Sequence, residues 1–466
     1  MVLINKWTTF GSGVLLEMVA GLQYSFSVYS ESMKASHHLT QGQVQFIGTV
    51  TNAGNYVFGM LSGATYDLLA VTRPNLAPRI TCSIGLVLCS VGYPLLWAVI
   101  TKRIYVSDDA DTMTAVLAFL AFLAALAGPF CDGTAMTVSV QNFPRHRGQV
   151  VGQLKSFVGL ATSLHLAVYS ATKHTDSSDF ILLQVVSASS ACLLGMICQN
   201  VVPIGRSGES ENDDSAANRK LRITFIWGAV IAAAVAGISL MPVSTPRYVH
   251  VYAASGLMAT LVAMLLWTAL SSGPVLLKGP DPDLQEPLLG PHPEGCGDSP
   301  TTADGEARTE EEDLDIRVHQ IMAEDEVDAA AAGRHAEEKL QLMEVEPQVS
   351  LAGALMSPTY WLLYAIVMIG TGAGLTFNNN LAQIVLSFGG EPGSQIVFVA
   401  LYSVSSCVAR SLFGELSQQA LLHRGTPRTA FLVLSTALTT IASLVAASGS
   451  LPLMYLASVA GGFAFG

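Results

Sequence analysis

The chain has 466 residues, of which 51% are hydrophobic and 12% charged, and its mean hydropathy is +0.46. Soluble globular domains are about a quarter charged, so this composition excludes an ordinary soluble fold. The net charge of −12 is local, because residues 272–350 hold 20 Asp and Glu but only 5 Lys and Arg. The charge therefore predicts one acidic loop and gives no reason to expect a nucleic-acid partner.

Apolar runs recur along the whole chain. Each has roughly 16–28 residues, about the length needed to cross the ~30 Å hydrocarbon layer of a membrane. The runs cover residues 7–29, 44–70, 80–100, 112–138, 149–171, 180–203, 222–242, 248–271, 359–386, 394–415, 429–447 and 451–466. The first run is too long for the core of a signal peptide, so we interpret it as a spanning helix. The sequence predicts an all-α protein in the lipid bilayer with about 12 spans.

An internal repeat relates residues 21–79 to residues 374–428. Gly21-Leu22 corresponds to Gly374-Leu375, and Gly63 and Gly414 follow at nearly equal spacing. Each segment then closes on an arginine, Arg79 or Arg428. The alternative is that any two apolar hairpins resemble each other in this way.

The repeat predicts a bundle of two pseudo-symmetric helical halves. Residues 1–203 form the first six-helix half, 204–271 an inserted helix pair, 272–350 an acidic disordered loop, and 351–466 the second half. Only four helices are counted in the second half, so we expect it to be incomplete and the chain to be truncated at its carboxyl end.

Orientation follows from the short loops, because cytoplasmic loops are enriched in Lys and Arg. Eleven such residues, among them Lys6, Arg73 and Arg79, lie on one side and five, among them Lys34 and Lys102, on the other. The amino terminus and the acidic loop are therefore expected to be cytoplasmic. That loop is the candidate site for a cytosolic protein partner.

Enzyme chemistry finds no support in the sequence. Six of the seven cysteines lie in apolar runs, and only Cys296 is in a polar segment, with no metal-ligand spacing. A phosphate-binding loop and a nucleophile beside a base are also missing, so we expect neither an enzyme nor a cofactor. His165, within an apolar run, is interpreted as a packing residue.

One segment carries a family signature. Residues 142–160 read N-F-P-x-x-R-G-x-V-V-G-x-L-K-x-F-V-G-L, and residues 21–30 read G-L-Q-Y-S-F-S-V-Y-S. Gly92-Tyr93 lies between these two segments. The second half contains Leu375-Thr376-x-x-Asn379-Asn380-Leu381-x-Gln383-Ile384. This pattern resembles the nodulin-like proteins of the major facilitator superfamily. The resemblance implies a secondary transporter that moves a small solute by alternating access. The alternative is a sensor or scaffold that kept the transporter fold.

Two positions depart from that resemblance. Asn52 and Asn379 stand where such proteins often carry aspartate, and a neutral amide cannot release a proton. If those aspartates couple protons in relatives, this chain needs another carrier. The candidates are the intramembrane acids Glu17 and Asp132.

A charged side chain within a span costs free energy, so we first consider a functional role for each such residue. Asp132 and Lys155 lie at comparable depths in the fourth and fifth spans, so an ion pair would relieve both desolvation costs. The alternative is that Lys155 extends to the cytoplasmic interface.

A second candidate device is the stretch Gly63-x-x-x-Asp67, followed by Arg73 and Arg79. It resembles the loop between helices two and three that latches the cytoplasmic face of facilitator proteins. Arg410-x-x-x-Gly414 would be its counterpart in the second half. A plain positive-inside anchor is the alternative.

Neutral polar residues on the first and second helices of each half are the substrate-site candidates, because transporters built from repeats bind their solute near midplane between the halves. The candidates are Gln23, Tyr24, Asn52, Asn55, Asn378, Asn379, Asn380 and Gln383. Such groups fit a polar or zwitterionic solute, although Arg410 or Lys155 is available to an anion. Hydrogen bonding between helices is the alternative role.

The orientation is testable by cysteine labelling of intact cells. A cysteine placed at Ser299, in the acidic loop, should stay unlabelled by an impermeant reagent, and one placed at Lys102 should react. Strong labelling at 299 with none at 102 would reverse the topology.

Overall fold

The computed structural model describes residues 5–172, 177–202, 211–241, 245–270, 351–391, 394–427 and 429–466. The predicted acidic loop and Arg428 lie outside these ranges. The chain divides into two compact units, Met1–Val275 with Tyr364–Gly466, and Leu276–Leu363. The packing described below is that of the first unit.

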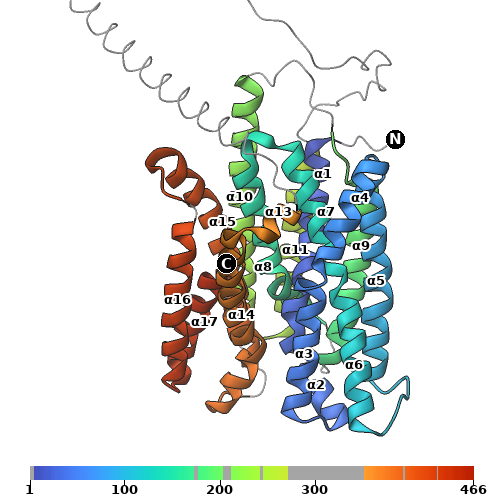
Figure 1. Cartoon of the computed structure of the whole chain (residues 1–466). Helices are drawn as coiled ribbons and strands as arrows, with labels where there is room; N and C mark the ends of the chain where they lie inside the picture. The colour runs from blue at the N-terminus through green and yellow to red at the C-terminus, as the bar shows by residue number, and fades with distance from the viewer. Residues whose placement is uncertain are drawn as a thin grey trace, which may run out of the picture. The chain divides into compact units, whose positions relative to one another are not determined.

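Every described element is helical (Figure 1). The early helices are α1 (Lys6–Ala20), η1 (Gly21–Ser25), α2 (Phe26–His37), α3 (Gln41–Tyr56), α4 (Gly59–Thr72), α5 (Ala77–Ile100), α6 (Ala110–Ala125), α7 (Ala127–Asn142), η2 (Pro144–His146), α8 (Arg147–Tyr169), η3 (Ser177–Asp179) and α9 (Phe180–Cys198). The later ones are α10 (Glu211–Ser239), α11 (Arg247–Leu270), α13 (Leu351–Met356), α14 (Pro358–Ser387), α15 (Gln395–Arg424), α16 (Thr429–Ala447) and α17 (Leu451–Phe465).

Helix occupies each of the twelve apolar runs. Among the described residues, eight helical segments are long and apolar enough to cross a membrane, with α6 and α7 counted as one segment. The other four runs miss that standard for visible reasons: two are broken into shorter helices, α8 carries polar and charged residues, and α17 has 15 residues. The fold is thus an all-α membrane bundle of the major facilitator type, and the crossing of those four runs stays a prediction.

Three of the first four apolar runs are interrupted partway along. A 3₁₀ segment, η1, separates α1 from α2; residues 57 and 58 separate α3 from α4; and Leu126 separates α6 from α7, just before Pro129. Proline cannot donate a backbone hydrogen bond, and 3₁₀ stretches inside helices often mark functional hinges. Interrupted backbone is tolerated at membrane depth only where protein or a cavity adjoins it.

Side-chain caps define several helix starts. Asn5 and Thr40 each form a reciprocal capping box, at α1 and α3. Asp109 begins α6, where its carboxylate accepts hydrogen bonds from the hydroxyl and the backbone N–H of Thr112. These bonds lower the pKa of Asp109, because they stabilise its charged form.

The most extensive helix contact among the described elements joins the early and late helices of the unit. α8 packs along α15, and their backbones approach where Gly152 faces Gly414. α10 also packs on α8 and α15, whereas α11 packs on α1 and α8. Small residues permit such close approach in membranes, where dispersion contacts drive helix association. α8 therefore holds the unit together, and the division into halves plus an inserted pair stays a prediction.

Gly21 permits η1 to lie directly on α8. A Cβ at this position would stand 2.2 Å from the Val158 carbonyl oxygen and 2.6 Å from the Ala161 Cβ, so the two backbones would have to separate. We predict that Gly21→Ala lowers the stability by about 1–3 kcal/mol, the usual cost of overpacking. The matched control is Gly42→Ala, where an added Cβ meets nothing within 4 Å. Thermal unfolding in detergent compares the two, and equal midpoints would contradict the packing.

Candidate functional site

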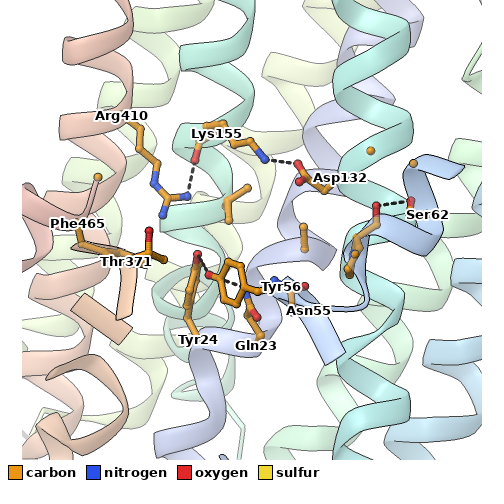
Figure 2. Close-up of a pocket in the computed structure, with 17 residues that line it drawn as sticks. Gln23, Tyr24, Asn55, Tyr56, Ser62, Asp132, Lys155, Thr371, Arg410 and Phe465 are labelled. Atoms are coloured by element: carbon orange, nitrogen blue, oxygen red, sulfur yellow. Dashed lines mark hydrogen bonds and ion pairs between the residues drawn. The ribbon is translucent and has the colours of Figure 1, made fainter. Parts of the chain in front are cut away.

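A cavity of about 530 Å³ lies among these interrupted helices (Figure 2). Its walls come from η1, the α3–α4 break, α7, α8, α14, α15 and α17. The lining residues are Ala20, Gln23, Tyr24, Asn55, Tyr56, Gly59, Ser62, Gly63, Pro129, Asp132, Gly133, Lys155, Val158, Thr371, Arg410, Phe465 and Gly466. Early and late helices thus share one polar cavity, of a size suited to a small molecule.

Lys155 is the centre of an ion cluster on the cavity wall. Its ammonium contacts the Asp132 carboxylate, as the comparable depths of the two residues predicted, and Figure 2 shows the two side chains meeting. The structure adds a third member, because Glu17 Oε2 on α1 lies 3.7 Å from the same Nζ. One cation therefore serves two carboxylates.

Glu17 is the least solvated member of this cluster. Its side chain has no exposed surface, and among the described residues neither carboxylate oxygen has a hydrogen-bond partner. An ionised carboxylate removed from water is costly unless it is paired, and here only one side of it faces a cation. A proton entering the cluster would relieve that cost.

Arg410 reaches the cavity from α15. Its Nη1 donates to the backbone carbonyl oxygen of Lys155, at 3.1 Å. Its guanidinium carbon lies 5.8 Å from the Tyr24 ring centroid and 5.6 Å from that of Phe465. Such contacts with aromatic rings stabilise the cation and restrict its orientation.

A chain of neutral polar groups continues along the wall. Gln23 Nε2 donates to the Tyr56 hydroxyl at 3.2 Å, and the Tyr24 and Tyr56 hydroxyls are 3.1 Å apart. Gln23 and Tyr24 belong to η1, and Tyr56 ends α3. The two helix breaks therefore present phenol and amide groups to the same space.

The predicted site residues divide into two groups. Those that line the cavity are Gln23, Tyr24, Asn55, Gly63, Asp132, Lys155 and Arg410, and Glu17 adjoins it through Lys155. Those that do not line it are Asn52, Asn379, Asn380, Gln383, Asp67, Arg79 and Gly414.

The structure gives the amides of α14 different contacts from those expected. Asn380 accepts a hydrogen bond from Gln45, and Gln383 accepts one from Gln41, so both pair with the beginning of α3. Asn378 is buried and donates to the Tyr24 carbonyl oxygen at 3.4 Å. The reason is distance along the helix, because Asn380 lies nine residues beyond Thr371, a rise of about 14 Å.

Of the proposed latch residues, Gly63 and Arg410 line the cavity, and Asp67, Arg73, Arg79 and Gly414 do not. Asp67 and Arg79 are exposed, and a Cβ added at Gly63 would meet nothing within 4 Å. Gly414 packs on Gly152 of α8.

Sequence reasoning missed Tyr56, Thr371 and Phe465. Tyr56 directly follows Asn55 in a polar stretch, and that adjacency was a usable signal. Phe465 and Thr371 stand in apolar runs where they look like ordinary packing residues, and only the three-dimensional arrangement brings them to the cavity.

Comparison with known proteins agrees with this architecture. The family model described as Nodulin-like matches residues 6–270, more than half of the chain. The chain belongs to the nodulin-like family. It is also similar to Protein NUCLEAR FUSION DEFECTIVE 4 of Arabidopsis thaliana, with 23% identity over 180 residues. That match covers 38% of this nodulin-like protein and 28% of the Arabidopsis protein, so the similarity applies only to the shared segment.

The ion cluster generates a stability prediction. Lys155→Met removes the only cation within ion-pair distance of Glu17 among the described residues, and we expect a loss of about 3 kcal/mol because a buried charge is left unpaired. Adding Glu17→Gln should restore part of that loss. The midpoint of thermal unfolding in detergent measures both.

Lys34→Met is the matched control, because Lys34 bonds Gln41 at an exposed helix end. A single Lys155→Met variant that unfolds at the wild-type midpoint would show that Lys155 does not compensate Glu17.

Proposed function

We propose that this nodulin-like protein is a secondary transporter that moves a small polar solute by alternating access. The observation that carries the proposal is the polar cavity walled jointly by early and late helices, with side chains of both lining it. The family supports transport at the coarse level. Repeat-built transporters bind their solutes at such a junction of broken helices.

Two hydrogen bonds between α3 and α14, at some distance from the cavity along both helices, are the proposed gate. Gln41 and Gln45, at the beginning of α3, bond Gln383 and Asn380 of α14. Gln45 precedes the cavity residue Asn55 by ten residues, or about 15 Å of helix. Neutral amide pairs exchange readily with water, so this contact can open at little cost. In the predicted orientation the gate faces away from the cytoplasm.

The ion cluster is the proposed coupling element. Two carboxylates share the Lys155 ammonium, so a proton can enter and leave without creating an isolated buried charge. Glu17 and Asp132 would then take the role that Asn52 and Asn379 cannot. Movement of α8 against α15 would change the solvent access of Lys155 and Arg410 together.

Partners follow from the same proposal. The multi-pass helical architecture implies contact with the lipid bilayer, and the cavity implies a small-molecule solute. We propose a cytoplasmic amino terminus, on the distribution of Lys and Arg over the loops. We also propose a packing role for His165, whose ring nitrogens are hydrogen bonded to the Ala161 carbonyl oxygen and the Ser187 hydroxyl. A cytosolic partner of the acidic loop belongs to the competing hypothesis of a sensor or scaffold.

Proteoliposome uptake separates the transporter from the sensor or scaffold. We expect saturable uptake of a member of a panel of labelled sugars, amino acids, organic acids and nucleosides. Tyr56→Phe removes the hydroxyl shared by Gln23 and Tyr24 and should raise the half-saturating concentration about fivefold to tenfold. Tyr105→Phe is the control, since the Tyr105 side chain is exposed and bonds Asp108. Uptake no greater than that of protein-free liposomes across the panel would favour the sensor or scaffold.

Asp67 tests the gating assignment. The residue lies on α4 beyond the cavity, exposed near Arg73. Asp67→Asn should shift the balance between inward-facing and outward-facing states and so lower the transport rate more than the solute affinity. Measured in the same liposomes, lost affinity with an intact maximal rate would mean that Asp67 binds solute and does not gate.

A further inference from the structure

The two cations of the cavity, Lys155 and Arg410, differ in the carboxylates that lie close enough to neutralise their charge. Lys155 contacts two carboxylates, whereas among the described residues no carboxylate lies within ion-pair distance of Arg410. A guanidinium has five N–H donors. One of them bonds the Lys155 carbonyl oxygen, and even if the neighbouring Tyr24 hydroxyl accepts another, at least three remain. Arg410 is thus the side chain with charge and donors available to a ligand.

Its surroundings hold the guanidinium ready. The Tyr24 and Phe465 rings flank the cation at 5.8 and 5.6 Å, and the Lys155 carbonyl oxygen fixes one of its edges. Figure 2 shows the side chain extending from α15 toward the space above Tyr24 and Thr371. A guanidinium whose orientation is already restrained loses less entropy on binding, and its planar pair of N–H donors matches the two oxygens of a carboxylate.

Charge balance limits the ligand further. Glu17 and Asp132 offset Lys155 and Arg410, so the cluster is neutral when both acids are ionised. A single negative charge is balanced by one proton on the carboxylate pair, but a dianion would require two. The remaining walls offer neutral groups, Gln23, Asn55 and Tyr56, together with the Phe465 ring. These features fit an organic body better than a compact inorganic ion.

We propose that Arg410 is the anion-binding residue of the cavity and that the solute is a small organic monocarboxylate. This inference rests on the proposed role of the cavity as the solute site. The carboxylate would lie against the guanidinium, and the organic part would occupy the space between the Phe465 and Tyr24 rings and the amides of the opposite wall.

Binding to the purified protein in detergent tests this without any need for transport. The probes are acetate, benzoate and phenylacetate, each paired with its neutral amide, and inorganic phosphate, followed by the concentration dependence of the thermal unfolding midpoint. At least one carboxylate should stabilise the protein saturably, with its amide and phosphate inactive. Arg410→Lys should weaken carboxylate binding about tenfold, because lysine keeps the positive charge but lacks the planar, two-donor geometry of the guanidinium. Arg410→Gln should abolish the binding.

Lys220→Gln is the matched control. The Lys220 ammonium also lies over aromatic rings, at 4.2 Å from Trp7 and 5.7 Å from Trp267, but it does not line the cavity. This variant should bind the carboxylate with the wild-type dissociation constant. If Arg410→Gln does not fold, Arg410→Lys is the deciding variant. Unchanged carboxylate affinity in Arg410→Lys would overturn the proposed role of the planar guanidinium.

Three results would overturn the inference: no stabilisation by any of the three carboxylates, equal stabilisation by a carboxylate and its amide, or stronger stabilisation by phosphate. Uptake of a neutral solute without carboxylate binding would remove the anion site and leave the transporter proposal standing. Carboxylate binding that depends on Arg410, without uptake of any solute, would support the anion site and contradict the transporter proposal.

Discussion

The structure depends on the two ways in which Lys155 is bound. Its ammonium holds the carboxylates of Glu17 on α1 and Asp132 on α7, and its backbone carbonyl accepts from Arg410 on α15. Charges at membrane depth persist only when they are paired or reach water. Three charged residues on three other helices are therefore tied to Lys155 of α8, the helix that also packs most extensively on α15.

The cavity follows from that arrangement. Interrupted backbone in the first, second and fourth apolar runs would be costly against lipid, but here it adjoins the polar space beside Lys155. The breaks in turn bring Tyr24 and Tyr56 within hydrogen-bond distance across two helices. Gly21 and the Gly152–Gly414 approach bring η1 and α15 close to α8, so small residues set the distances at which the polar groups act.

Much of the fold was readable from the sequence, because run length and apolarity report directly on the solvent that a helix meets. The Asp132–Lys155 contact was also predictable, since depth along two adjacent spans depends on residue count alone. The position of Asn380 was not, because its contact with Gln45 depends on how far α14 extends past the cavity and on which face it turns toward α3. Glu17 joins the cluster through a helix that is distant in sequence, and no local pattern predicts that contact.

We propose that solute reaches the cavity when α3 and α14 separate at the Gln41–Gln383 and Gln45–Asn380 contacts. Cysteines at Gln41 and Gln383, whose side chains are hydrogen bonded, can be joined by a short bifunctional thiol reagent that is cleaved by reductant. The cross-linked protein in proteoliposomes should lose solute uptake, reductant should restore it, and variants with only one of the two changes should be unaffected. Uptake that continues at the wild-type rate with the cross-link in place would contradict this gate.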